Sequence, residues 1–362
     1  MITISLCMIV KNEEEVLARC LESVKDAVEE MIIVDTGSSD RTKEIAAGFT
    51  DKVFDYTWID DFASARNFSF SKAAMEYCMW LDADDVLTAE DRQKLLELKR
   101  ELQPDTDVIM ARYHTAFDDK GNPTFSYYRE RILRRCPRAL WKGKVHEAIS
   151  PWGKIYYADF AISHKKLKPS DADRNLRIYE RQIAQGEELS PRDLFYYGRE
   201  LYYHRRWPEA AAVLERFLKE GQGWLENDIE ACRFLAYSRY GMKQGEKALE
   251  AFLLSLKYDE PRAEICCDIG KHFLDLGQYR LAVFWYELAL TRKRNDTSGA
   301  FVSDECYGYL PCIQLCVCYD RLGHYLKAAE YNERAGRYKP DSAAVQTNRR
   351  YFGQKGVKSG GL

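Results

Sequence analysis

The sequence has 362 residues, of which 46% are hydrophobic and 31% are charged. This length predicts two or three folded domains, and this composition excludes a chain that is disordered, collagen-like or coiled-coil throughout. The net charge of −3 gives no electrostatic argument for nucleic-acid binding, and no apolar run approaches the roughly 18 residues of a membrane span.

The first apolar run of the chain ends at Lys11 and has no basic lead-in, so it reads as a β-strand rather than as a secretion signal. The eleven cysteines are scattered without paired CxxC spacing. This is typical of free core thiols, and metal ligation by cysteine is the less favoured alternative. Both observations lead us to expect a protein of the reducing cytoplasm.

The first hundred residues alternate strand and helix patterns. Apolar runs predict buried strands at residues 2–10, 31–35, 53–58 and 78–85. Helices are predicted to begin near Asn12 and Asp40 and to cover residues 62–77 and 89–102; Asn12 and Glu15 have the spacing of a capping box. The alternation predicts a parallel sheet that is covered on both faces.

From residue 108 to residue 164 the pattern changes to extended segments, and Asp119–Asn122 has the composition of a hairpin turn. We therefore expect an antiparallel or mixed addition to the sheet. Beyond residue 168 the chain is helical and repeats. A small residue stands twelve positions before an alanine in four segments: Gly198–Ala210, Ala236–Ala248, Gly270–Ala282 and Cys316–Ala328. This matches the tetratricopeptide period of roughly 34 residues, and a generic helical bundle is the alternative.

The expected fold class is therefore α/β followed by all-α. The α/β domain is expected over residues 1–168, with a mostly parallel, Rossmann-like sheet. A linker helix is expected over residues 169–192, helical repeats over residues 193–345 and a frayed tail over residues 346–362.

Ligands of an open parallel sheet bind beyond the carboxyl ends of its strands, so the residues that follow each strand are the candidates for a site. Three strands deliver such side chains: Lys11, Asn12 and Glu13; Asp35; and Asp82, Ala83, Asp84 and Asp85. The Asp35 carboxylate could accept a hydrogen bond from a nucleobase or a ribose hydroxyl.

The acidic cluster after the fourth strand is the sharpest signal. In an extended segment Asp82 and Asp84 face the same side, and converging carboxylates repel one another unless a cation neutralises them. Oxygen ligands suit Mg²⁺ or Mn²⁺. The alternative is that these acids cap the following helix, for which Asp85 and Thr88 are equally well placed.

Phosphate binding at this edge would need cations, because the sequence has neither a GxGxxG nor a GxxxxGK[ST] loop. Arg66 and the basic run between Arg129 and Lys144 are candidates, and a solvated basic face is the alternative. Glu147 could be a general base for an incoming hydroxyl or thiol, although spacing alone favours a salt bridge with the arginines. On a strand, His146 and Glu147 would point to opposite sides.

Several motifs together resemble family 2 glycosyltransferases of the GT-A fold. They are LCMIVKNEE at the first strand, IIVDTGSSDRT around Asp35, DFASARN around Arg66 and WLDADD around Asp82 and Asp84. The run WKGKVHE, ending at Glu147, and SHKK around His164 narrow the resemblance to a subgroup with tetratricopeptide repeats, which includes sublancin-type peptide S-glycosyltransferases.

The resemblance implies an inverting enzyme with a nucleotide-sugar donor, a UDP-sugar above all, and Mn²⁺ or Mg²⁺ as cofactor. It implies that Asp35 contacts the uridine, Asp82 the ribose and Asp84 the metal, with Lys11–Glu13 near the nucleobase. Arg66 and Ala83 join the nucleotide-sugar site, and Asp82 and His164 join the metal site. Family 2 enzymes often carry an ED-type base, and the HE pair that ends at Glu147 stands in its place.

Three functions stay open at this point. The first is an active glycosyltransferase whose acceptor is held partly by the repeats; a peptide or protein is favoured and a cell-envelope saccharide is the alternative. The second is an interaction scaffold with an inactive enzyme domain. The third, a nucleotidyltransferase, would need a glycine-rich basic loop after the first strand, where the sequence has KNEEE.

Overall fold

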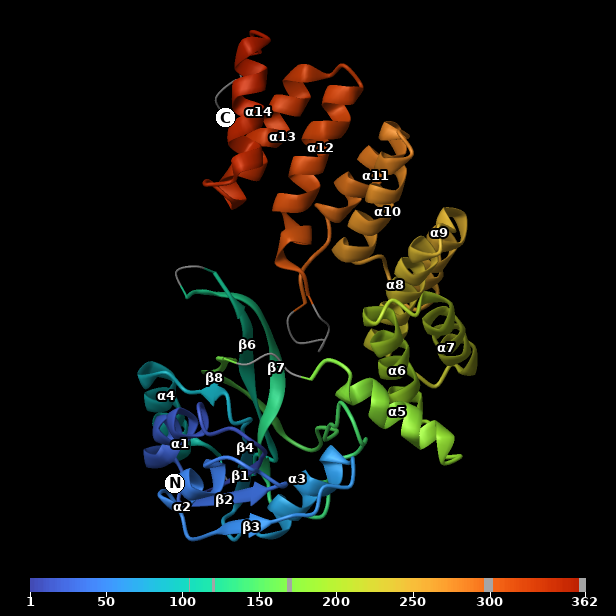
Figure 1. Cartoon of the computed structure of the whole chain (residues 1–362). Coiled ribbons are helices and arrows are strands. Elements are labelled where there is room, and N and C mark those ends of the chain that lie inside the picture. The colour runs from blue at the N-terminus through green and yellow to red at the C-terminus, as the bar shows by residue number, and fades with distance from the viewer. Residues whose placement is uncertain (104, 119–120, 168–170, 296–301, 358–362) are drawn as a thin grey trace. The chain divides into compact units, whose positions relative to one another are not determined.

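A computed structural model describes the chain except for residues 104, 119–120, 168–170, 296–301 and 358–362. The chain divides into two compact units, Met1–Leu189 and Ser190–Leu362. The first unit is a mixed sheet with helices, and the second is helical (Figure 1). The expected fold class, α/β followed by all-α, is confirmed.

Within its described residues the first unit is built on one eight-stranded sheet, with the order β3-β2-β1-β4-β7-β6-β8-β5. The strands are β1 (Ile4–Val10), β2 (Glu30–Asp35), β3 (Val53–Asp55), β4 (Tyr77–Trp80), β5 (Asp85–Val86), β6 (Val108–Phe117), β7 (Pro123–Arg134) and β8 (Ile155–His164). β1 lies between β2 and β4 and is parallel to both. β7 is antiparallel to β4 and β6, which confirms the mixed addition. The turn predicted at Asp119–Asn122 lies partly outside the described residues.

Helices cover both faces of this sheet. On one face, α1 (Leu17–Val24) and α4 (Ala89–Glu101) pack against the even-numbered residues of β1, and α2 (Thr42–Ala47) joins them. On the other face, α3 (Phe62–Ser71) packs against Cys7 and against the alternate residues of β2. Alternate side chains of a strand point to opposite faces, so a continuous apolar run is buried on both sides, as predicted.

The predicted start of the first helix is wrong. α1 begins at Leu17, and its amino terminus has no capping side chain. Asn12 has a left-handed backbone, with φ of 56°, and its side-chain oxygen accepts a hydrogen bond from the Ser39 N–H at 2.8 Å. Asn12 therefore ties the loop after β1 to the loop after β2.

Other predicted boundaries also differ from the structure. α3 ends at Ser71, and β4 begins at Tyr77, which the sequence pattern had assigned to the helix. The third strand is short because the chain leaves the sheet after Asp55. The second helix begins at Thr42, and its first free N–H donates to the Asp40 carboxylate at 3.0 Å.

The second unit consists, over its described residues, of helices that follow one another as stacked antiparallel pairs (Figure 1). They are α6 (Pro191–Tyr203), α7 (Trp207–Glu220), α8 (Leu225–Gly241), α9 (Gly245–Leu254), α10 (Ala263–Asp275), α11 (Tyr279–Ala289), α12 (Tyr309–Arg321), α13 (Tyr325–Tyr338) and α14 (Ala343–Gln354). The alanine of each repeat is fully buried. A Cβ added to Gly198 would lie 2.7 Å from the Leu214 side chain, so the small residue permits the close approach of α6 and α7. These are repeats of the tetratricopeptide type.

Two segments near the expected domain boundaries are ordered into helices. α5 (Arg174–Ala184) belongs to the first unit, where Arg181 pairs with Asp60. Lys144 of the same unit pairs with Glu187, just beyond α5, at 2.6 Å. α14 continues to Gln354, into the segment that was expected to be frayed.

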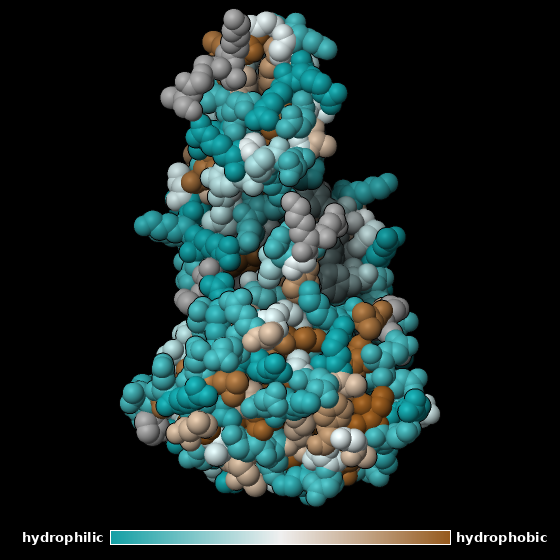
Figure 2. All heavy atoms as spheres, turned by 90° about the vertical axis from the view of Figure 1, so that its left-hand side faces the viewer, coloured by the Kyte–Doolittle hydropathy of each residue, from teal (hydrophilic) through white to brown (hydrophobic). Residues whose placement is uncertain are grey.

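The face in Figure 2 is mostly hydrophilic, and the cysteines are mostly buried. Hydrophilic residues cover most of the face in Figure 2, and hydrophobic ones form scattered patches among them. In the part of the chain that the structure describes, no helix has both the length and the apolarity to cross a membrane. The cysteines are free thiols, and all but Cys136 are buried, which confirms the interpretation as core thiols.

Candidate functional site

The loops that follow β1 and β2 are bound to each other at the carboxyl edge of the sheet. Val10 pairs with Asp35 in the last step of the ladder between these strands. Beyond it, the Asn12 N–H donates to the Ser38 hydroxyl at 2.9 Å, and the Glu13 N–H donates to the Thr42 hydroxyl at 2.7 Å. Lys11–Glu13 therefore lie beside the Asp35 loop, as their place after β1 predicts.

Asp35 is buried at the end of β2 with one carboxylate oxygen unused. Its Oδ1 accepts hydrogen bonds from the N–H groups of Gly37 and Ser38, both at 2.9 Å. Its Oδ2 is buried and has no hydrogen-bond partner among the described residues. A buried acceptor without a donor costs about 1–3 kcal/mol, so a ligand that brings an N–H or O–H group to this oxygen would be stabilised.

The acidic segment after β4 forms a tight turn, because the Asp85 N–H donates to the Asp82 carbonyl at 3.0 Å. The expectation that Asp82 and Asp84 extend to the same side is therefore wrong. Asp82 points toward Arg66, and Asp84 points toward His164. Thr88 caps α4 by accepting from the Asp91 N–H at 3.1 Å, so these acids do not serve as the cap.

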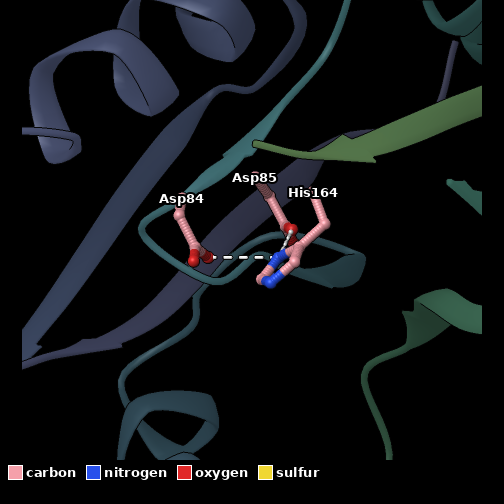
Figure 3. A group of neighbouring side chains, drawn as sticks. All are labelled: Asp84, Asp85 and His164. Atoms are coloured by element: carbon pink, nitrogen blue, oxygen red, sulfur yellow. Dashed lines mark hydrogen bonds and ion pairs between the residues drawn. The ribbon is translucent and has the colours of Figure 1, made fainter. Parts of the chain in front are cut away.

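Asp84, Asp85 and His164 form the group with the chemistry of a cation site, with ligand atoms all within 4.8 Å of one another. β5 pairs with β8, and this places Asp85 opposite His164. In Figure 3 both carboxylates point toward the ring of His164; each lies 3.2 Å from its Nδ1 atom. Two carboxylates and an imidazole can hold Mn²⁺ or Mg²⁺.

The electrostatics of this group centre on the ring of His164. Burial alone would lower the pKa of His164, but hydrogen bonds to Asp84 and Asp85 raise it to about 10. The ring is therefore protonated at neutral pH in the absence of a metal, and its charge offsets the two carboxylates. A divalent cation can take over that task once the proton leaves.

A second group of side chains is centred on Arg66, on α3. Arg66 Nε donates to Glu147 Oε1 at 2.6 Å and Arg66 Nη2 donates to Asp82 Oδ1 at 2.7 Å. The guanidinium lies 4.9 Å from the ring centres of both Trp80 and Trp141. Although burial alone would raise the pKa of the Asp82 carboxyl, the cations Arg66 and Arg131 lower it to about 2.

The segment that carries Glu147 is a loop rather than the expected strand. His146 has a left-handed backbone with φ of 51°, and an isolated bridge joins Lys142 to Ala148. The salt bridge that spacing favoured for Glu147 is present, and its partner is Arg66.

The structure thus divides the predicted site residues into three sets. In the first set, Lys11–Glu13 lie beside Asp35. In the second, Arg66 pairs with Asp82 and with Glu147. In the third, Asp84 contacts His164 at the turn in which Ala83 is buried. Asp85 was a candidate at the strand end without a role in the site, and Arg131 was a candidate only as part of the basic run expected to bind phosphate. Tyr113, which also contacts Asp85, was missed. The doubled aspartate after Ala83 was the available signal for Asp85.

The first unit is similar to proteins of a known family. Residues 5–152 match the family model described as Glycosyl transferase family 2. A TPR repeat-containing protein of Synechococcus elongatus is 38% identical over 152 residues, which cover 41% of this chain and 36% of that protein. The SPbeta prophage-derived glycosyltransferase SunS of Bacillus subtilis is 29% identical over 228 residues, which cover 59% of this chain and 53% of SunS.

A third relative is the lipopolysaccharide core biosynthesis glycosyltransferase LpsC of Rhizobium meliloti. It is 27% identical over 159 residues, which cover 42% of this chain and 58% of LpsC. The chain spans between 36% and 58% of the length of these relatives. The similarity therefore concerns the shared domain and not each whole protein.

Proposed function

We propose, from the premise that the chain carries a domain of glycosyl transferase family 2 at residues 5–152, that it is an inverting, metal-dependent glycosyltransferase. The donor is a nucleotide sugar, favoured as a UDP-sugar. The favoured acceptor is a Cys, Ser or Thr side chain of a peptide or protein, held partly by the helical repeats. The observation that carries the proposal is the Asp84, Asp85 and His164 group.

The nucleoside end of the donor is assigned to the loops after β1 and β2. Asp35 Oδ2 is a buried acceptor that lacks a donor among the described residues, and an N–H of the nucleobase would supply one. Lys11–Glu13 are bound to the same loop and would line the base. Asp82 would receive the ribose, and Ala83 and Arg66 would complete this part of the site.

The reacting end of the donor is assigned to the turn after β4. Asp84 and His164 would hold Mn²⁺ or Mg²⁺ together with Asp85, which takes the place expected for Asp82, and their donor atoms fit such an ion. When bound, the ion supplies positive charge against the negative charge that develops on the leaving diphosphate.

Glu147 is the proposed general base. Its Oε1 is held by Arg66 at 2.6 Å, so its Oε2 is the oxygen that would take the proton from the acceptor hydroxyl or thiol. The activated acceptor then attacks the anomeric carbon on the face opposite the diphosphate, and this displacement inverts the configuration. A thiolate acceptor would need the base less, because it is already deprotonated.

The choice of acceptor rests on the second unit. Stacked repeats of this type present an extended surface on which a polypeptide can lie. A cell-envelope saccharide is the second candidate, and the similarity to LpsC is the observation that favours it.

A donor screen tests the proposal. The full chain is incubated with a panel of UDP-sugars and Mn²⁺, and released UDP is measured with and without EDTA. Mass spectrometry then identifies the product from a peptide library and from a lipopolysaccharide core saccharide. We expect one donor to release UDP, and EDTA to stop the release. If no donor reacts and UDP does not bind in the presence of Mn²⁺, the chain is an interaction scaffold and the proposal is wrong.

A further inference from the structure

A fully buried polar cluster lies directly behind the proposed cation site. Asp85 on β5 and Arg131 on β7 form an ion pair at 3.2 Å, and the side chains of both residues have no solvent exposure. Tyr113 on β6 is also buried. A buried ion pair of this kind is weak evidence for stability, because well-packed apolar residues of similar volume often serve as well or better. We therefore look for a role of this cluster other than stabilising the fold.

The Asp85 carboxylate is engaged on both of its oxygens. Oδ2 accepts from the Asp82 N–H at 3.0 Å and from Arg131 Nη1 at 3.2 Å. Oδ1 accepts from the Tyr113 hydroxyl at 2.9 Å and lies 3.2 Å from His164 Nδ1. One oxygen thus fixes the backbone of the acidic turn, and the other faces the ring of His164.

Arg131 is held between two aromatic rings. Its guanidinium lies 3.7 Å from the centre of the Trp80 ring and 4.1 Å from the centre of the Tyr113 ring. Its Nη1 also donates to the Trp80 carbonyl at 3.3 Å. A planar guanidinium can stack between rings while it donates at its edge, whereas the compact ammonium of lysine cannot do both.

Tyr113 links the cluster to the ring that would bind the metal. Its hydroxyl lies 2.8 Å from His164 Nδ1 and donates to Asp85 Oδ1. The same hydroxyl thus contacts both members of the pair that β5 and β8 bring together. The partners of a metal-binding histidine set its orientation, and their loss typically lowers metal affinity about 10- to 100-fold.

We propose that Arg131 and Tyr113 are positioning residues for the cation site: they hold Asp85, and through it they orient the acidic turn and the ring of His164. The inference rests on the proposed function, because it requires a cation between Asp84 and His164. The proposal adds Arg131 and Tyr113 to the site, although neither takes part in the reaction and both lie within strands rather than in the loops at the carboxyl edge.

The test measures Mn²⁺ affinity rather than turnover. Mn²⁺ alone is titrated into the full-length protein, and bound ion is read from the loss of the free Mn²⁺ signal in electron paramagnetic resonance. We expect Tyr113→Phe to weaken binding about tenfold and Arg131→Lys to weaken it by at least as much. Thermal unfolding of each variant is followed in parallel.

Tyr77→Phe is the matched control. Tyr77 is a buried tyrosine of the same sheet, and its hydroxyl donates to the Thr106 carbonyl at 2.7 Å, at the opposite end of β4 from the acidic turn. Its loss should cost stability as Tyr113→Phe does, yet leave Mn²⁺ affinity unchanged. If Tyr113→Phe and Arg131→Lys bind Mn²⁺ as tightly as Tyr77→Phe does, the positioning role is wrong while the cation site stands. If the unmodified chain binds no Mn²⁺, the cation site itself is wrong.

Discussion

Two groups of acidic side chains lie at the carboxyl edge of the sheet, and they differ in the cation that the protein supplies. Asp82 and Glu147 share Arg66, whose guanidinium is charged at every accessible pH. Asp84 and Asp85 share His164, whose charge depends on a proton that can leave, although Asp85 also pairs with the buried Arg131. A permanent cation thus holds both acids of the first group, whereas Asp84 in the second group pairs with the removable charge of His164 and is therefore available to an external ion.

The largest expected effect comes from the second group. Asp84→Ala removes a carboxylate that pairs with His164 in the proposed site, so we expect UDP release to fall by more than about 10²-fold with the donor that the screen identifies. Thermal unfolding should stay close to that of the unmodified chain. Glu90→Ala, on the exposed first turn of α4, is the control. Full UDP release by Asp84→Ala in excess Mn²⁺ would contradict the metal assignment.

Glu147→Gln separates the two possible roles of the first group. Glutamine can still accept the hydrogen bond from Arg66 Nε but cannot take a proton. If Glu147 is the general base, turnover should fall about 10²-fold or more, with little change in donor binding. The measurement is turnover across a range of pH. Unchanged turnover at every pH would exclude Glu147 as the base and leave it as the partner of Arg66.

A pH titration of Mn²⁺ binding tests directly whether the His164 ring must lose its proton before the ion binds. Because hydrogen bonds to the aspartates raise the pKa of His164 to about 10, the ring must release a proton before it binds Mn²⁺. Mn²⁺ affinity should therefore rise about tenfold per pH unit between pH 7 and pH 9. Calorimetry in buffers of different ionisation enthalpy should show close to one proton released per ion. His164→Gln should abolish this dependence, and binding without proton release would refute it.

The raised pKa of His164 also makes the stability of the metal-free chain depend on pH. A raised pKa means that the protonated ring stabilises the folded state. That contribution is complete below the ordinary histidine value of 6.5 and is lost as the pH rises through about 10.

The smallest expected effect lies in the repeats and leaves both acidic groups untouched. Gly198→Ala places a Cβ 2.7 Å from the Leu214 side chain, so we expect the free energy of unfolding to fall by about 1–3 kcal/mol. Gly353→Ala, on α14, meets nothing within 4 Å and should leave stability equal or slightly higher. Urea denaturation measures both. A change in Mn²⁺ affinity in either variant would contradict the expectation that residues of the first unit alone form the cation site.

Local patterns predicted the elements of the fold well. The four apolar runs of the first hundred residues correspond to β1, β2, β3 and β4, and the repeat glycines Gly198 and Gly270 lie where helices meet. These features depend on residues that are close in the sequence or on a repeat period that can be read from the sequence, and they could therefore be predicted.

The pairing of the site residues could not be read in the same way. Glu147 meets Arg66 across 81 positions, and His164 meets Asp85 across 79 positions. Both pairings depend on how β7 and β8 join the sheet, which strand propensity alone does not define. The turn at Asp82 has the same origin, because Asp85 leaves it to pair with β8.

In the proposed nucleoside site, the unused oxygen of Asp35 would affect the choice of nucleotide. At the ring position where uracil carries a hydrogen, cytosine carries a lone pair, and a lone pair facing a buried carboxylate oxygen is repelled. Asp35 Oδ2, a buried acceptor whose lack of a donor costs stability, would thereby favour binding of uridine over cytidine. This preference would not depend on the sugar of the donor.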